Sequence, residues 1–156
     1  MIFVVESPTI RPRAKLGGAC DLLVVLERMK HYDFFIDRRC RLFLAVRKAT
    51  PFESNAEIET CFGRIEELLI SIPRKRFSLL VDARSGPLRN DPAYEATLTA
   101  HRGKLLLGFA KNAAVAATAA GQMQIQRFAR VDGRKVFATD DPAAAFEYLG
   151  LPKHEW

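Results

Sequence analysis

The sequence has little of what marks a membrane-spanning or secreted protein. No stretch approaches the roughly 18 to 20 consecutive apolar residues of a membrane span. The richest stretch, LLLGFAKNAAVAATAA, is interrupted by Lys111 and Asn112. The first residues, MIFVVESPTI, contain only the short apolar run IFVV after the initial methionine and no basic segment before it, which is not the pattern of a secretory signal. We therefore expect a cytoplasmic protein without a membrane span.

Cysteine and histidine are scarce and widely spaced. The three cysteines are Cys20, Cys40 and Cys61, and no C-x-x-C pair occurs. This spacing indicates neither a zinc site nor a disulfide framework, and reduced thiols are expected. His31 and His154 are isolated in the sequence, and no histidine pair has the i, i+4 spacing of a helical metal site. We expect no bound metal.

Nucleotide-binding and hydrolase motifs are also absent. The chain has neither G-x-G-x-x-G nor G-x-x-x-x-G-K-[ST], so no cofactor is expected. Asp82, Ser85 and His101 have the residue types of a hydrolytic triad, but no G-x-S-x-G surrounds the serine. His101 lies on the apolar stripe of a predicted helix, which favours a packed histidine. We do not expect an enzyme.

What the chain does contain is the composition of one soluble domain. Of its 156 residues 49% are hydrophobic and 27% charged, and 24 basic against 18 acidic residues give a net charge of +6. That charge suits an acidic partner, a nucleic acid or an anionic surface, although the basic residues are scattered, as on an ordinary solvated surface. Gln124, Arg127 and Arg130 near Phe128 form a basic helix face, but no nucleic-acid-binding motif accompanies them. Nucleic acid is not an expected partner.

Strand and helix signals alternate from residue 31 onward. Alternating apolar residues predict a β-hairpin from the strands 31–37 and 41–47. Ser54 and Glu57 form a capping box at the start of a helix that ends at Pro73. FSLLVD then reads as a buried central strand.

The second half repeats this alternation. Asp91 and Pro92 are typical of a helix start, and Thr118 can cap a third helix running to about Asp132. NAAVAAT and RKVFAT are the predicted strands around that third helix, and DDPAAAFEYLG is the final helix. The predicted order is β-β-α-β-α-β-α-β-α, with the last three strands parallel. The fold class is α/β: a mixed sheet, containing an antiparallel hairpin and parallel strands, covered by about four helices.

The ends of the chain are less regular. IFVV predicts a short strand, and DLLVVLERMK fits either a short helix capped by Asp21 or an extra strand. We divide the chain into an N-terminal extension (1–30), a domain (31–150) and a C-terminal tail (151–156).

Sites in open α/β sheets lie beyond the carboxyl ends of the parallel strands. Here those ends are three loops on one edge, two of which lead into helix N-termini, where free N–H groups attract anions. The alternative is that Asp91, Thr118 and Asp141 simply cap their own helices. The candidate ligand- or partner-binding residues on this edge are Asp82, Arg84, Ser85, Arg89, Asn90, Asp91, Thr118 and Thr139.

The stretches HYDFFIDRRCRLFLAVRKATPF, LLVDARSGPLRNDPAYE and LLLGFAKNAAVAATAAGQMQIQRFAR resemble an uncharacterised bacterial family. Its members are similar to the anti-sigma-factor antagonist, or STAS, domains, and the family is sometimes likened to the CRAL-TRIO lipid-transfer domains. The resemblance covers about residues 31–150, and Val81–Glu95 is its most specific part. It implies a small regulatory module with a STAS-like sheet.

STAS antagonists are switched by phosphorylation of a Ser or Thr at the start of the helix after this loop. Asn90 and Asp91 hold that place here, and Ser85 lies several residues too early, so the switch does not carry over. We expect a non-enzymatic signalling module that binds another protein or forms a homodimer, the partner being unknown. The alternative is a binding domain for a small anionic or lipid-like ligand.

Overall fold

The structure, a computed structural model that describes residues 22–89 and 91–156, begins its regular part with antiparallel strands. The predicted hairpin is confirmed as β2 (Tyr32–Asp37) and β3 (Leu42–Arg47), paired in register from Tyr32↔Arg47 to Asp37↔Leu42. A further strand, β1 (Val24–Arg28), pairs antiparallel with β2 and contains an irregularity between Val25 and Glu27. The strand interpretation of DLLVVLERMK is therefore the correct one of the two alternatives.

The first helix follows its predicted cap. α1 (Asn55–Ile70) begins after Ser54, whose side chain accepts a hydrogen bond from the Glu57 N–H at 3.2 Å. The Glu57 carboxylate accepts from the Glu53 N–H at 2.9 Å, one residue before the position that an ideal capping box uses. The apolar side chains of α1 recur at helical spacing and five of them are buried: Ile58, Cys61, Phe62, Ile65 and Leu69.

The remaining strands are parallel and joined by helices. A 3₁₀ turn, η1 (Arg74–Arg76), leads into β4 (Ser78–Asp82), and α2 (Pro92–Leu106) connects β4 to β5 (Lys111–Val115). α3 (Ala119–Val131) connects β5 to β6 (Phe137–Thr139), and α4 (Pro142–Leu149) follows. Within the described residues the six strands form one sheet in the order β1-β2-β3-β4-β5-β6. The predicted α/β class, a mixed sheet with four helices, is confirmed.

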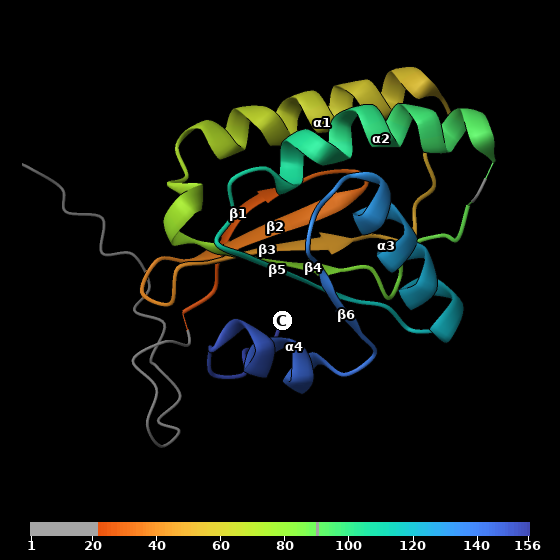
Figure 1. Ribbon diagram of the computed structural model, residues 1–156. Helices are drawn as coiled ribbons and strands as arrows, with labels where there is room; N and C mark the ends of the chain where they lie inside the picture. Colours follow the sequence, from red (N-terminus) through yellow and green to blue (C-terminus); the bar gives the residue numbers. More distant parts are fainter. Residues whose placement is uncertain (1–21, 90) are drawn as a thin grey trace, which may run out of the picture.

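The two faces of the sheet are covered differently (Figure 1). α1 and α2 pack side by side on one face, and α3 lies beside α2 next to β5 and β6. This face holds the larger apolar core, which includes Phe34, Phe43 and Leu79. Of the four described helices only α4 lies on the other face, over a core that includes Leu42, Leu80 and Phe146. β3 and β4 are buried on both faces, as expected for central strands.

The sheet extends beyond the domain boundaries drawn from the sequence. β1 lies within the stretch set apart as an N-terminal extension, and the tail 151–156 packs against the α4 face through His154. The predicted IFVV strand, the Asp21 cap and Asn90 lie outside the described residues. Within the described ranges, none of the helices combines the length and apolar character needed to cross a bilayer.

The expectation of reduced cysteines is wrong for one residue. Cys61 is a free thiol buried in α1, and this burial raises its pKa to about 11. Cys40, which lies between β2 and β3, is disulfide-bonded. Spacing alone could not reveal this bond, because no short cysteine motif marks it.

Candidate functional site

The edge at the carboxyl ends of the parallel strands carries a buried carboxylate at its centre. Asp82 ends β4 and is bound from two sides. Arg84 donates to it through Nε (3.0 Å) and Nη2 (2.9 Å), and the Trp156 indole N–H donates at 2.8 Å. Burial alone would raise the pKa of Asp82, but the hydrogen bonds from Arg84 and Trp156 outweigh it and hold the pKa below its usual value. The tail thus covers the end of β4.

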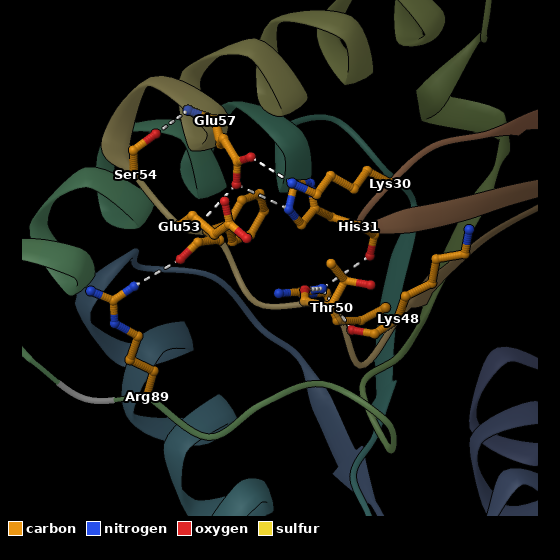
Figure 2. A network of polar contacts seen from close by, with 10 residues as sticks. Lys30, His31, Lys48, Thr50, Glu53, Ser54, Glu57 and Arg89 are labelled. Atoms are coloured by element: carbon orange, nitrogen blue, oxygen red, sulfur yellow. Dashed lines mark hydrogen bonds and ion pairs between the residues drawn. The ribbon is translucent and has the colours of Figure 1, made fainter.

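Arg89 is occupied in a similar way. Its Nε donates to the Asp91 carboxylate, its Nη1 donates to the Phe52 carbonyl at 3.2 Å, and its guanidinium lies over the Tyr94 ring. Figure 2 shows this side chain reaching across from its loop to the segment that precedes α1. Arg89 therefore fastens the 83–91 loop to the β3–α1 connection.

The same connection carries a network around Glu57 (Figure 2). Oε1 of the Glu57 carboxylate forms an ion pair with Lys30 Nζ at 2.7 Å, and Oε2 lies 3.4 Å from Nε2 of the buried His31 ring. The Glu53 N–H and the Lys30 ammonium hold the pKa of Glu57 below its usual value. Burial and the nearby Arg47 guanidinium lower the pKa of His31. The network joins the start of β2 to the start of α1.

The other predicted site residues mostly cap helices. The side chain of Asp91 accepts from the Tyr94 N–H at 3.0 Å, and that of Thr118 accepts from the Gly121 N–H at 3.0 Å. The Thr139 hydroxyl accepts from the Asp141 N–H at 3.1 Å. The capping alternative is thus what the structure contains, since the helix starts are filled by their own side chains.

The described members of the predicted set lie at the carboxyl ends of β4, β5 and β6 or in the loop that follows β4. Ser85 is exposed, and both Arg84 and Arg89 already pair with carboxylates of their own loop. The hydrolytic triad does not assemble. Asp82 bonds the tail on the α4 face, whereas His101 stacks on Phe62 of α1 on the opposite face, with ring centroids 5.5 Å apart.

A second polar cluster, which we call the Asp37 cluster, was not foreseen. It consists of Asp37 at the end of β2 with Cys40 and His154, all three buried. His154 Nε2 lies 2.8 Å from Asp37 Oδ2, and its Nδ1 lies 2.7 Å from the Pro152 carbonyl oxygen. Both ring nitrogens thus face oxygen acceptors, which orients the ring fully.

The Asp37 carboxylate is the hub of this cluster. It accepts from the backbone N–H groups of Leu22, Arg39 and Cys40 at 2.9–3.1 Å, besides its contact with His154. Burial alone would raise the pKa of Asp37, but these hydrogen bonds outweigh it and lower the pKa. The ligand atoms of these three side chains lie close enough together to hold a metal ion. However, Asp37 and His154 already use these atoms in hydrogen-bond contacts within the protein, and Cys40 is disulfide-bonded. The cluster fits a structural clasp better than a metal centre.

A groove of about 450 Å³ lies on the same edge, between the loop that follows β4 and the outer side of α3. Leu88 and Met123 line it and are 64% and 69% exposed, and basic side chains surround them. We call it the Leu88–Met123 groove. Arg127 and Arg130 of α3 are recognisable in the sequence as part of a basic helix face. Leu88 was not predicted, because its only signal is an apolar residue within a polar loop.

Comparison of the chain with protein-family models, with curated proteins and with solved structures finds no significant match. The STAS-like resemblance therefore stays a prediction, and function has to be argued from the geometry.

Proposed function

We propose that this protein is a non-enzymatic interaction module that binds an acidic segment of another protein in the Leu88–Met123 groove. The observation that carries the proposal is the pair of exposed apolar side chains, Leu88 and Met123, which lie together in a hollow with a basic rim. Large apolar side chains grouped in a hollow are typical of a surface that another molecule covers. The regulatory character implied by the STAS-like resemblance is part of this proposal.

The charges around the groove select the partner. Arg130 is exposed, and its guanidinium pairs with no carboxylate in the part of the chain that the structure describes. Arg127 forms an ion pair with Glu95, and Arg89 forms one with Asp91. Because a guanidinium has five N–H donors, both side chains retain donors for a further acceptor. A segment with Leu or Met-sized side chains flanked by Asp or Glu complements this arrangement. The protein's net charge of +6 favours the same partners at long range.

A peptide selection tests the proposal. A random peptide library displayed on phage is selected against the folded protein, with counter-selection on the double variant Met123→Glu/Arg130→Glu. We expect enriched peptides that combine acidic with apolar residues and bind the wild type at least tenfold more tightly than the double variant. Binding should weaken as salt is raised, because the rim contacts are exposed.

The matched control is Lys75→Glu, which changes an exposed basic residue in the 3₁₀ turn η1, away from the groove. This variant should bind the selected peptides as the wild type does. Peptides that bind both variants equally, or a selection that enriches nothing over the counter-selection, would contradict the assignment of the groove.

Self-association is a second form of the same proposal. β1 is an edge strand of the sheet, and its Val24 and Val25 are 58% and 45% exposed. An edge strand with exposed valines can pair with a copy of itself. Light scattering over a range of concentrations should show a dimer that Val25→Lys dissociates, and a strict monomer at all concentrations would remove this form.

A further inference from the structure

A pocket of about 120 Å³, partly open to solvent, lies between α2, α3 and the sheet. Its floor is formed by β4, the residue that follows it and β5, where Ala83 and Ala114 present only methyl groups, and its roof by Ile125 and Phe128 of α3. Ala129 adds another small side chain from the helix. Space remains because small residues face one another where larger ones would close the gap. We call this the α2–α3 cavity.

Two residues that line this apolar cavity each carry a buried polar atom with no hydrogen-bond partner among the described residues. The first is Oδ1 of Asn112, a β5 residue that is only 8% exposed. Asn112 pairs in register with Leu79, whose side chain belongs to the core under α1 and α2, so the amide points to that face of the sheet. A buried amide oxygen without a donor costs roughly 1–3 kcal/mol. No donor for this oxygen comes from the residues that the structure describes.

The second orphaned atom is Nη1 of Arg102. The guanidinium is held in place on its other edges. Nε and Nη2 donate to the Asp132 carboxylate at 2.6 and 3.0 Å, Nη2 also reaches the Thr99 hydroxyl, and the ring of Phe128 lies 4.0 Å below the group. Arg102 is thus a fixed donor rather than a mobile surface cation.

The charge of this donor is already balanced. The Asp132 side chain is 2% exposed and makes a two-pronged ion pair with Arg102. An anionic ligand would have to compete with the Asp132 carboxylate for the Arg102 guanidinium. An uncharged ligand avoids that competition.

We propose that the α2–α3 cavity binds a small uncharged molecule that has an apolar ring or short chain and one hydroxyl group. The hydroxyl donates to Asn112 Oδ1 and accepts from Arg102 Nη1, because one hydroxyl both donates and accepts. Its apolar part lies against Ala114, Ala129 and Phe128. The volume sets the size, since a comparable apolar cavity of about 150 Å³ holds benzene. The site is separate from the Leu88–Met123 groove, and either proposal can fail alone.

Phenol, benzene and benzoate are the probes, with binding followed by the amide chemical shifts of Asn112, Ala114 and Ala129 in the full-length protein. We expect phenol to bind about tenfold more tightly than benzene, because benzene leaves both polar atoms unpaired. Benzoate should bind more weakly than phenol. In Asn112→Leu the preference of phenol over benzene should fall to about twofold or less.

Filling the cavity supplies a second, independent readout. Ala129→Leu should abolish the shifts for all three probes, whereas Ala100→Leu, at an exposed position of α2, should leave them unchanged. Ala129→Val replaces Ala129→Leu if the larger side chain prevents folding. Equal binding of phenol and benzene, or phenol shifts that survive the filled cavity, would overturn the proposal. A crystal structure with phenol present that shows only water bridging the two polar atoms would also overturn it.

Discussion

The Asp37 cluster and the residues that line the α2–α3 cavity both contain buried polar atoms, but they differ in how completely these atoms are hydrogen-bonded. Asp37 accepts three backbone N–H groups and faces His154, and both ring nitrogens of His154 face acceptors. In the cavity wall, Asn112 Oδ1 and Arg102 Nη1 have no partner in the described chain. The completed network of Asp37 serves the fold, whereas the proposed ligand of the α2–α3 cavity would complete the other one.

The largest effect on the free energy of unfolding is expected from a substitution at Asp37, in the fully bonded cluster. Asp37→Ala removes one acceptor from three backbone donors and from His154, all in a site where the paired side chains are 0% exposed. We expect a loss of about 3–5 kcal/mol in the free energy of unfolding, measured by urea denaturation. The control is Asp140→Ala at an exposed position, which should change it by less than about 0.5 kcal/mol. Similar losses for both variants would show that the cluster is not a clasp.

Acid should weaken the same cluster. The pKa of Asp37 and that of Asp82 are lowered in the folded protein, so the carboxylates stabilise the fold above their unfolded-state pKa, and this contribution is lost as the pH falls through the folded-state values. The urea midpoint should drop below about pH 5. Asp91, Glu27 and Glu57 also have lowered pKa values and titrate in this range, so the decisive measurement is a comparison with Asp37→Asn. That variant should lose less stability on acidification, and an equal loss would assign the acid sensitivity to the other carboxylates.

A substitution in the C-terminal tail, at the carboxyl ends of the parallel strands, should have a smaller effect on stability. Trp156→Phe keeps an aromatic ring near Phe146 but removes the N–H that donates to Asp82. We expect the free energy of unfolding, measured by urea denaturation, to fall by about 1 kcal/mol. The loss is small because Arg84 still pairs with the carboxylate and water can reach the place of the indole N–H, since Trp156 is partly exposed. An unchanged midpoint would show that water replaces the indole completely.

The smallest effect is expected at Asn112. Asn112→Leu exchanges an unsatisfied buried amide for an apolar group of similar volume, so the free energy of unfolding should stay within about 0.5 kcal/mol of the wild type or rise. Urea denaturation without added ligand measures this. A loss comparable to that of Asp37→Ala would mean that the amide is fully bonded in the protein, and the contrast between the two clusters would disappear.

Most of the fold could be predicted because its signals are local. The caps Ser54, Asp91 and Thr118 lie within three residues of the N–H groups they bind, and apolar alternation identified the hairpin. DLLVVLERMK stayed ambiguous because a short apolar run fits a helix and a strand equally well, and only its pairing with β2 decides.

The position of the candidate site in the fold could be predicted from the sequence, but the contacts between its residues could not. The carboxyl edge follows from the order of strands and helices, whereas the burial of Asp82 under Trp156 joins residues 74 positions apart. No pattern in the sequence reports such a contact. Asn112 can be recognised in the sequence as a residue of interest, since an amide within the small-residue run KNAAVAAT is unusual for a buried strand.

The strands of the sheet lie in the order in which they occur in the chain. During synthesis each new strand can therefore add to the edge of the sheet already formed, and no strand has to be inserted between two others. The clasp between Asp37 and His154 is the exception, because it spans 117 residues and closes only when the tail has been made. Until then, Asp37 at the end of β2 lacks its partner. A released chain truncated before residue 154 should therefore still form the sheet but be more easily unfolded by acid or urea than the full chain.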